Sequence, residues 1–364
     1  MGQCRSFRVR RSVTTALVSL LAATSVGAAL PASAESAPAQ QAHSTVLRVT
    51  VHSRALEGNL EGDSPDRDVS VYLPPGYSAN RGRHYPVLYM LHGFTETDLS
   101  YFGAGTFTNI PTITDRALAN GTARDMIIVT PNAKTVYGGS NYSSGATTGD
   151  WETFISRELV SYVDKHFRTI RDRAGRGLAG HSMGGYGTLR IGMKHPDVFS
   201  ALYVLSSCCI SPTSNIPDTP EEIATMEAYT AHPEDYTGVP AGIGTAVAAA
   251  ASWAPNPGKA PLYFDSPFKD GVLQPAVFAR MTANRPLAMV DQYIPTLRTQ
   301  KIAFDVGNLD TNIAANLTEL DRILTSYHVS HSFEVYEGNH TNRIPERFET
   351  KVLPFFAQQL RSAR

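Results

Sequence analysis

A serine between two glycines, Gly180-His181-Ser182-Met183-Gly184, is the pattern in this sequence with the clearest chemical use. An apolar run, Gly177–Gly180, leads into it, and a helix-compatible run follows it to Met193. A nucleophilic serine must project from a tight turn between a strand and a helix, and the flanking glycines leave room for the neighbouring backbone. The start of a helix also favours the negative charge that develops during acyl transfer. We therefore predict that Ser182 is a nucleophile.

Two later residues fit the base and the acid that a serine nucleophile needs. Asp310 follows the apolar run Ile302–Val306, and His340 follows the run Phe333–Tyr336. In serine hydrolases built on parallel sheets the chain order is Ser, then Asp or Glu, then His, each at the carboxyl end of a strand. Asp310 as acid and His340 as base satisfy that order. The competing residues lie inside a strand, before the last strand or at a helix end: Asp305, His328, His331 and His195.

Two backbone N–H groups are expected to form an oxyanion hole, one after the nucleophile and one in a loop after an early strand. Met183 supplies the first donor. The apolar run Tyr85–Leu91 leads into His92-Gly93-Phe94-Thr95-Glu96, and the amide of Phe94 is the expected second donor. We expect His92 to be a packed, hydrogen-bonded loop residue rather than a catalytic one.

Eight short apolar runs bounded by turn residues predict the strands that position these side chains. Two runs alternate apolar and polar residues, as half-exposed antiparallel strands do, and three are almost continuously apolar, as central parallel strands are. The alternating runs are Leu47–Val51 and Val69–Leu73, the continuous ones are Tyr85–Leu91, Met126–Thr130 and Ala201–Leu205, and the others are Gly177–Gly180, Ile302–Val306 and Phe333–Tyr336.

Apolar side chains at helical spacing lie between these runs, over 151–167, 313–327 and 348–360, and Asp150 is placed to cap the first of these helices. Strands that alternate with helices predict an α/β fold with a mostly parallel, doubly wound sheet and antiparallel N-terminal strands. Residues 210–299 break the alternation with a long Pro-, Gly- and Ala-rich stretch, so we expect a cap-like insertion of short helices, one of them over Gly242–Trp253. We predict one catalytic domain over residues 45–364 that contains this insertion.

The N-terminus has the layout of a secretory signal peptide over residues 1–34, with four arginines, an apolar stretch and the small-residue pattern Ala32-Ser33-Ala34. A membrane anchor is the competing interpretation, but the apolar stretch is short and rich in small residues. Arg10-Arg11 leaves both the general and the twin-arginine export routes open. We expect a secreted protein, with a disordered mature terminus over residues 35–44.

Composition and charge exclude several classes of protein. The 364 residues include 32 Lys and Arg against 33 Asp and Glu, a net charge of −1 that argues against a dedicated nucleic-acid binder. Removal of residues 1–34 takes away four arginines and no acid, which leaves 28 basic against 33 acidic residues and a net charge of −5. We expect no nucleic-acid partner and no membrane insertion of the mature chain, and the oligomeric state stays open.

The cysteines and acidic residues indicate no metal centre. After Cys4 is removed with the signal peptide, only Cys208-Cys209 remain, either as two buried small residues or as a vicinal disulfide. The acidic cluster Glu61, Asp63, Asp66 and Asp68 lacks the spacing of a calcium loop and is expected to form a solvated turn.

With these motifs in place, the sequence resembles the esterase D-like family of α/β-hydrolases. That family includes feruloyl and acetylxylan esterases, S-formylglutathione hydrolases, enterochelin-type esterases and cell-wall mycolyltransferases. The segments that carry the resemblance cover most of the chain outside residues 210–299, which align to no one subfamily. They are Val71–Tyr77 (VYLPPGY), Tyr85–Phe94 (YPVLYMLHGF), Trp151–Thr169 (WETFISRELVSYVDKHFRT), Gly180–Thr188 (GHSMGGYGT), Asp305–Asp310 (DVGNLD) and Gly338–His340.

The resemblance implies the same triad of Ser182, Asp310 and His340, the same oxyanion donors, and catalysis without a cofactor. Tyr142 resembles a family position near the active site, and ordinary packing is the alternative for it. Three aromatic residues of the insertion either line an acyl pocket or pack in an ordinary core: Trp253, Tyr263 and Phe264.

The function expected from these residues is a secreted serine esterase that acts on small or polymer-attached esters with acetyl, feruloyl or other short or aromatic acyl groups. An acyltransferase of the mycolyltransferase type would use the same triad and pass the acyl group to a sugar hydroxyl. A peptidase would need room for an extended peptide. The non-enzymatic alternative is an exported binding protein on a hydrolase scaffold.

Overall fold

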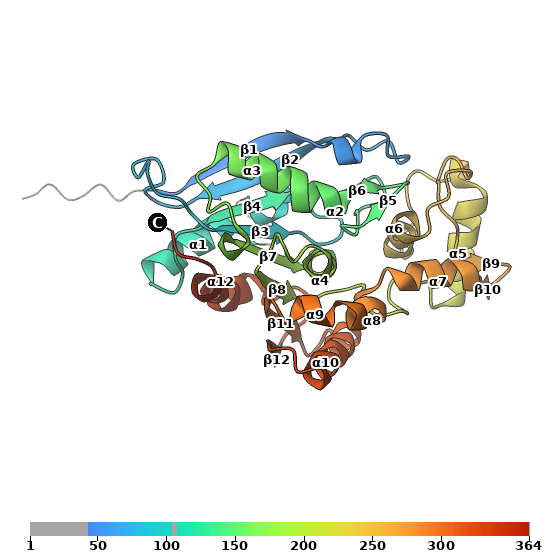
Figure 1. Ribbon diagram of the computed structural model, residues 1–364. Coiled ribbons are helices and arrows are strands. Elements are labelled where there is room, and N and C mark those ends of the chain that lie inside the picture. The colour runs from blue at the N-terminus through green and yellow to red at the C-terminus, as the bar shows by residue number, and fades with distance from the viewer. Residues whose placement is uncertain (1–42, 104–107, 364) are drawn as a thin grey trace, which may run out of the picture. The chain divides into compact units, whose positions relative to one another are not determined.

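Eight strands form the central sheet of the structure, a computed structural model that describes residues 43–103 and 108–363 (Figure 1). The strand order is β1-β2-β4-β3-β7-β8-β11-β12. The six strands from β4 to β12 run parallel, whereas β1 and β2 are antiparallel to their neighbours, which confirms the predicted fold class. The strands are β1 (Thr45–His52), β2 (Asp66–Leu73), β3 (Val87–Leu91), β4 (Ile127–Pro131), β7 (Arg176–His181), β8 (Ala201–Leu205), β11 (Lys301–Gly307) and β12 (His331–Tyr336).

Burial of the strands follows the sequence pattern at the centre of the sheet but not at β2. All residues of β3, β4 and β8 are buried, as their continuous apolar runs predict. The expectation of a half-exposed strand is wrong for β2, where Val69–Leu73 is buried throughout. Its polar side chains are satisfied inside the protein: Ser70 donates to Asp98 at 2.8 Å, and the Tyr72 hydroxyl donates to Asp115 at 2.6 Å. A strand between two others can therefore alternate in sequence and still be covered on both faces.

Helices cover both faces of the sheet. One buried cluster joins α1, α11 and α12 to the strands, and a second joins α2, α3, α4 and α10 to the opposite face. All three predicted helical stripes are present, and the carboxylate of Asp150 caps its helix by accepting from the Thr153 amide at 3.0 Å. These helices are α1 (Ile110–Ala119), α2 (Trp151–Thr153), α3 (Leu159–His166), α4 (Met183–Lys194), α10 (Thr311–Ser326), α11 (Ile344–Arg347) and α12 (Leu353–Gln359).

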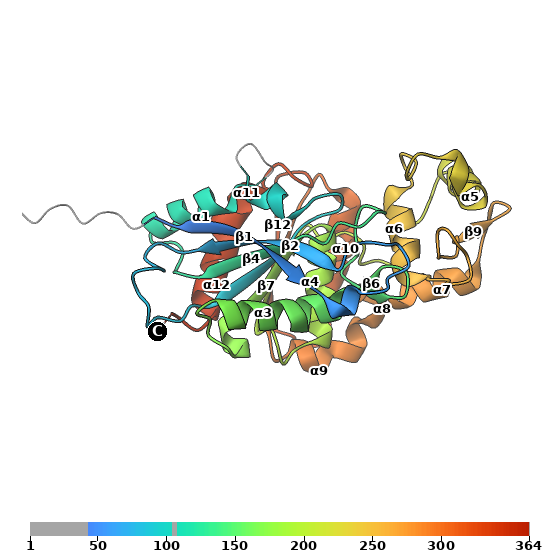
Figure 2. The same cartoon turned by 90° about the horizontal axis from the view of Figure 1, so that it is seen from above.

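The expected insertion between β8 and β11 consists of five helices and a two-stranded hairpin. Most of these elements lie at one end of the sheet in both views (Figures 1 and 2). The predicted helix over Gly242–Trp253 is α6, which begins two residues later and is buried along its alanine-rich length. The elements are α5 (Pro220–Ala231), α6 (Gly244–Trp253), β9 (Phe268–Lys269), β10 (Val272–Leu273), α7 (Pro275–Ala283), α8 (Pro286–Met289) and α9 (Ile294–Leu297). A separate small hairpin, β5 (Ser144–Gly145) and β6 (Gly149–Asp150), precedes α2.

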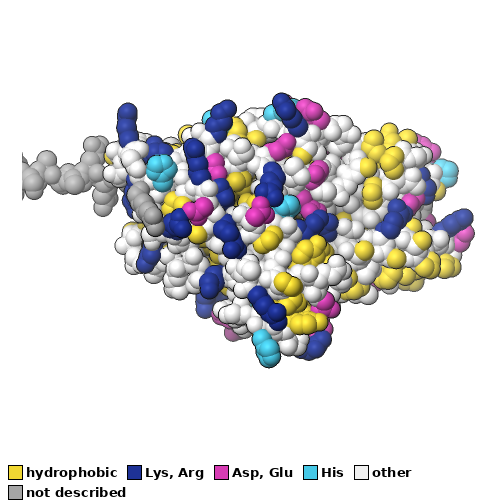
Figure 3. Space-filling view, in the orientation of Figure 1, with side chains coloured by type: hydrophobic (Ala, Val, Ile, Leu, Met, Phe, Trp, Pro, Cys, Tyr) yellow, Lys and Arg dark blue, Asp and Glu magenta, His cyan; other side chains and the backbone are white. Residues whose placement is uncertain are grey.

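The predicted signal peptide, residues 1–34, and most of the predicted disordered segment, 35–44, lie outside the described residues. The last residue of that segment, Ser44, is held in place, because its hydroxyl donates to Asp115 of α1 at 2.6 Å. None of the described helices combines the length and the apolar character needed to cross a membrane. On the face drawn in Figure 3, basic and acidic side chains are interspersed rather than separated.

Candidate active site

Ser182 lies at the sharp turn between β7 and α4. Its backbone has φ 56° and ψ −117°, a conformation that is costly for a residue with a side chain and that is found where a fold presents a functional group. The flanking glycines explain how the turn closes. A Cβ atom on Gly180 would collide with the backbone of Gly184, and one on Gly184 would collide with the carbonyl of Leu91. The glycines of the motif are therefore required by close backbone approach.

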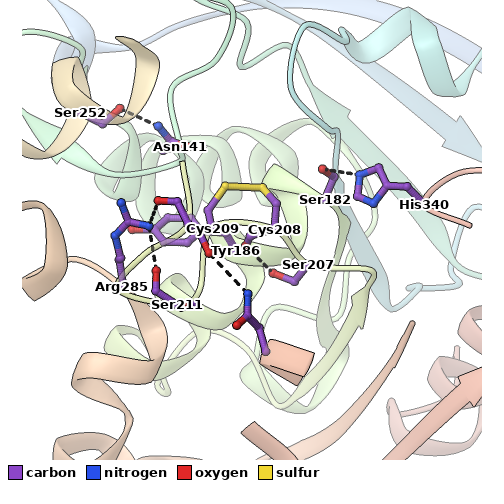
Figure 4. Close-up of a disulfide and its surroundings, with 12 residues drawn as sticks. Asn141, Ser182, Tyr186, Ser207, Cys208, Cys209, Ser211, Ser252, Arg285 and His340 are labelled. Carbon is purple, nitrogen blue, oxygen red and sulfur yellow. Dashed lines mark hydrogen bonds between the residues drawn. A yellow bond between two sulfur atoms is a disulfide. The ribbon is translucent and has the colours of Figure 1, made fainter. Parts of the chain in front are cut away.

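The structure brings Ser182, His340 and Asp310 together in one hydrogen-bonded chain. The Ser182 Oγ lies 2.9 Å from His340 Nε2, and His340 Nδ1 lies 2.6 Å from Asp310 Oδ2 (Figure 4 draws the first of these bonds). Asp310 follows β11 and His340 follows β12, so parallel strands deliver both side chains to the edge where β7 ends. With Nδ1–H donated to the carboxylate, Nε2 is free to accept the serine proton.

A cavity of about 510 Å³ opens beside this chain of residues. Ser182 is 7% exposed, and it lines the cavity together with His340 and the two residues expected to donate to an oxyanion, Phe94 and Met183. The amide of Met183 is the first of α4, so no carbonyl within the helix can accept from it. A substrate carbonyl bound at Ser182 would therefore meet at least this amide donor.

The loop that carries Phe94 is fixed by hydrogen bonds on both sides of that residue. The Gly93 amide donates to Glu96 Oε2 at 2.6 Å, and the Thr95 amide donates to the carbonyl of Gly138 at 2.9 Å. His92 is fully buried, and its Nε2 accepts from the Ala133 amide at 2.8 Å. Burial lowers the pKa of His92 to about 4, so it is neutral at physiological pH. His92 thus has the packed, hydrogen-bonded place that the sequence led us to expect.

A second buried histidine, His181, connects the serine turn to the loop of the predicted base. Its Nε2 lies 2.9 Å from the His340 carbonyl and must donate to it, while Nδ1 lies 3.3 Å from the Tyr101 hydroxyl. The two imidazole rings are 4.8 Å apart. Burial, with a smaller contribution from the nearby His340, lowers the pKa of His181 to about 3. The sequence motif contained His181, but its position gave no sign of this bridge.

The competing acid and bases have partners elsewhere. Asp305 is buried in β11, where it accepts from the Tyr203 hydroxyl at 2.8 Å and from Arg347 Nε at 2.9 Å, and burial raises its pKa to about 6. His331 is paired with Asp321 at 2.9 Å. Neither His195 nor His328 lines the cavity. Among these candidates, only His340 bonds to Ser182, and only Asp310 bonds to Nδ1 of His340.

Of the two alternatives left open for the four aromatic residues, pocket lining is not seen, because none of them lines the cavity at Ser182. Tyr142 is fully buried behind the Phe94 loop, where its hydroxyl donates to the His92 carbonyl at 3.0 Å. Trp253 is 2% exposed and donates through Nε1 to Ser143 Oγ at 3.0 Å. Phe264 packs edge-on against Tyr137, and the Tyr263 carbonyl accepts from Thr147. The rings of Tyr142, Trp253 and Phe264 are buried in the core, and Tyr263 is half-buried.

Other residues of the insertion line the cavity instead. They come from the turn before α5, from the first turn of α5 and from the start of α6: Asn215, Ile216, Pro217, Asp218, Glu222, Gly242, Thr245 and Ala246. No Lys or Arg is among the described residues of the lining, whereas three carboxylates are, those of Glu96, Asp218 and Glu222. Sequence reasoning missed this set because small and polar residues in turns carry no periodic signal.

Cys208 and Cys209 also line the cavity, and the structure pairs them in a disulfide. This settles the alternative that the sequence left open. The acidic cluster, in contrast, is not wholly a solvated turn. Both carboxylate oxygens of Glu61 are shielded from solvent, and burial next to Asp63 raises the pKa of Glu61 to about 9. The described residues contain no group of three or more His, Cys, Asp or Glu side chains arranged to hold a metal ion.

Comparison with known proteins adds a family and a fold to this geometry. Residues 64–349 match the family model described as "Putative esterase". The chain is 30% identical over 178 residues to an endo-1,4-beta-xylanase/feruloyl esterase of Xylanibacter ruminicola, an alignment that covers 47% of this chain and 22% of that one. The chain spans less than a third of the length of the curated relatives it matches.

Two solved structures share the fold. A ferulic acid esterase superposes with a TM-score of 0.61 at 24% identity, over 88% of this chain and all of that one. A fluorophosphonate-binding serine hydrolase from Staphylococcus aureus superposes with a TM-score of 0.57 at 18% identity, over 87% of this chain and 99% of that one.

Proposed function

The chain belongs to the Putative esterase family, and from this premise we propose that it is a serine hydrolase that cleaves carboxylic esters through an acyl-enzyme. The family match confirms the resemblance drawn from the sequence motifs. The observation that carries the proposal is the hydrogen-bonded chain from Ser182 through His340 to Asp310 at the wall of a cavity.

In the first half of the proposed reaction, Ser182 Oγ attacks the ester carbonyl carbon while His340 Nε2 accepts the serine proton. Asp310 holds the Nδ1–H of His340 and stabilises the imidazolium that forms. The amides of Phe94 and Met183 donate to the oxyanion of the tetrahedral intermediate. His340 then gives its proton to the leaving alcohol, and the acyl group remains on the serine.

In the second half, His340 takes a proton from water, and the resulting hydroxide attacks the acyl-enzyme carbonyl. The intermediate collapses to release the carboxylic acid, and the proton returns to Ser182. Every step uses side chains and amides of this chain, which is the chemistry expected of an enzyme that needs no cofactor.

The substrate class is the finer part of the proposal. The lining carries three carboxylates and no Lys or Arg among its described residues, so a negatively charged acyl group would enter without a partner. One relative and one structural neighbour are named for feruloyl or ferulic esters. We therefore propose uncharged esters with acetyl, feruloyl or similar acyl groups as substrates.

Export is a further part of the proposal. The signal-peptide pattern of residues 1–34 predicts cleavage near Ala34. The vicinal disulfide supports this, because disulfides persist mainly in oxidising compartments outside the cytosol. N-terminal sequencing of protein from the culture medium of an expressing bacterium tests it, and a chain that keeps residues 1–34 would contradict it.

The proposed activity is tested with a fluorophosphonate probe and an ester. The serine oxygen should displace fluoride from the probe, and mass spectrometry should locate the adduct on the peptide that contains Ser182. Ser182→Ala should keep the fold, lose the label and lose hydrolysis of p-nitrophenyl butyrate. Ser211→Ala, a serine outside the cavity lining, is the matched control and should behave as wild type. Equal labelling of Ser182→Ala and wild type would reject the assignment.

A further inference from the structure

The proposed reaction assigns no role to the Cys208–Cys209 disulfide. The pair follows the end of β8, and both residues line the cavity that holds Ser182. The Cys208 amide donates to the Ser182 carbonyl at 3.3 Å, so the pair is attached to the backbone of the nucleophile itself. Cys209 is 2% exposed and has φ 67°, so the backbone turns sharply beneath the two sulfur atoms.

The disulfide lies on the opposite side of Ser182 from His340. In Figure 4, His340 approaches the serine from one side and the S–S bond lies on the other, on the side of the two cysteines that faces Asn141, another lining residue. The segment that follows is also fixed. Arg285 is fully buried and donates to the Ser211 carbonyl at 2.8 Å, just beyond the pair.

The proposed chemistry decides which part of a substrate reaches the disulfide. His340 must protonate the leaving oxygen, so the alcohol part of the ester lies on the His340 side. The carbonyl oxygen points to the amides of Phe94 and Met183. The remaining substituent of the tetrahedral carbon is the acyl chain, which therefore extends away from His340 toward Cys208 and Cys209.

We propose that the Cys208–Cys209 disulfide is a specificity-determining wall of the acyl-binding side of the cavity. This rests on the proposed function, because it assigns the acyl side from the role of His340. The wall has no charge and, since the bond joins consecutive residues, its sulfur atoms cannot change rotamer independently. An acyl group long enough to reach it packs against a fixed, polarisable surface without ordering a flexible side chain. An acetyl group is too short to gain from it.

The first test keeps the leaving group constant and varies the acyl group. Wild type and Cys208→Ser/Cys209→Ser are compared on p-nitrophenyl acetate and p-nitrophenyl benzoate. Because a fixed wall is replaced by mobile side chains, kcat/KM for the benzoate should fall about tenfold more than kcat/KM for the acetate. Thr213→Ala, an exposed residue of the same segment outside the lining, is the matched control and should keep the wild-type ratio.

The second test reduces the disulfide in the folded wild-type protein. It tests the proposal even if the double variant does not fold. Dithiothreitol supplies two electrons and two protons, becomes a cyclic disulfide, and leaves Cys208 and Cys209 as thiols. The benzoate-to-acetate ratio of wild type should move to that of the variant and return on reoxidation. The double variant, which has lost both cysteines of the disulfide, should not respond to the reductant.

Two results would overturn the proposal. In the first, kcat/KM falls equally for the acetate and the benzoate, as expected of a purely structural bond. In the second, neither substitution nor reduction changes the benzoate-to-acetate ratio. Failure of the proposed function is a different result. In that case wild type would hydrolyse neither ester and would not react with the fluorophosphonate probe.

Discussion

The carboxyl edge of the sheet and the insertion at residues 210–299 both contribute to the cavity, but the fold positions their residues in different ways. At the sheet edge, Ser182, Asp310 and His340 each lie within four residues of the end of a parallel strand. In the insertion, the lining residues come from turns and from the ends of two helices. The position of a side chain that follows a parallel strand is predictable from the sequence, because neighbouring parallel strands end at the same edge of the sheet. The position of a side chain in a long insertion depends on how the insertion packs.

The two regions also differ in what holds them. Buried polar groups fix the sheet edge: His92 accepts from the Ala133 amide, and His181 donates to the His340 carbonyl. The insertion packs against the sheet side of the molecule through large side chains such as Trp253, whose ring lies 5.2 Å from the Tyr186 ring of α4 and 4.9 Å from the Arg285 guanidinium. Changes at the sheet edge should therefore affect turnover, and changes in the aromatic core of the insertion should affect stability.

The largest effect is expected from His340→Ala. Without a general base, kcat for p-nitrophenyl butyrate should fall by about 10⁶, the loss seen for triad members that act as a unit. KM should change much less than kcat, since the other lining residues stay in place. Steady-state kinetics measures kcat and KM, and far-UV circular dichroism checks the fold. A loss of less than about tenfold would place the general base elsewhere.

Asp310→Asn should have the next largest effect, a loss of about 10⁴ in kcat. The amide has the right shape but favours the wrong tautomer of His340, so the imidazole no longer presents an unprotonated Nε2 to Ser182. The fluorophosphonate reaction rate gives an independent measure and should fall as well. If Asp305→Asn reduced kcat more than Asp310→Asn does, the acid would have been assigned to the wrong residue of the DVGNLD segment.

His181→Phe removes the N–H that holds the His340 carbonyl at 2.9 Å. Misplacement of the base by a fraction of an ångström should reduce kcat by about 10- to 100-fold, with KM within about twofold of wild type. His181→Gln retains an N–H donor at the end of its side chain and should recover part of the loss. Equal kinetics for all three proteins would mean that the bridge has no role in positioning His340.

Acid should destabilise the sheet edge through its two buried histidines. The pKa values of His92 and His181, about 4 and about 3, lie below the ordinary value of 6.5, because burial disfavours the charged form. For a lowered pKa, stability is complete above pH 6.5 and is lost as pH falls toward the folded value.

Each of these histidines should cost about 2 kcal/mol of the free energy of unfolding at pH 5 relative to pH 7, at about 1.4 kcal/mol per pH unit below 6.5. Urea unfolding at several pH values measures this, and His181→Gln should show a shallower decline than wild type. A decline as steep as that of wild type would show that His181 does not titrate as a buried neutral group.

The smallest effect on turnover is expected from Trp253→Phe in the insertion. The substitution removes the Nε1–H bond to Ser143 at 3.0 Å, while Ser143 keeps its bonds to Asn141 and Tyr186, so the loss of one hydrogen bond should cost about 0.5–1.5 kcal/mol in stability. Because Trp253 does not line the cavity, kcat/KM for both p-nitrophenyl acetate and benzoate should stay within about threefold of wild type. Thermal unfolding and ester kinetics on the same sample separate the two effects. If kcat/KM fell for the benzoate but not for the acetate, Trp253 would have to be assigned to the acyl pocket.

The sequence by itself determined the eight strands, the parallel sheet and the residues that follow its strands. Strand periodicity and the glycines around Ser182 are local features, so a short stretch of sequence is enough to predict them. The chain order of Ser182, Asp310 and His340 predicts that all three lie at the same edge of the sheet. The amide of Phe94 was inferred in the same way, from the strand that ends before it.

Only the tertiary structure decided the burial of β2, the place of Tyr142 and Trp253, the bridge from His181 to His340, and the disulfide beside the nucleophile. The first three depend on contacts between segments far apart in the chain, and so does the place of the disulfide next to Ser182; residue type and spacing carry no information about such contacts. An aromatic residue can line a cavity or fill a core with the same sequence around it. The choice is made by the neighbours that the packed insertion supplies.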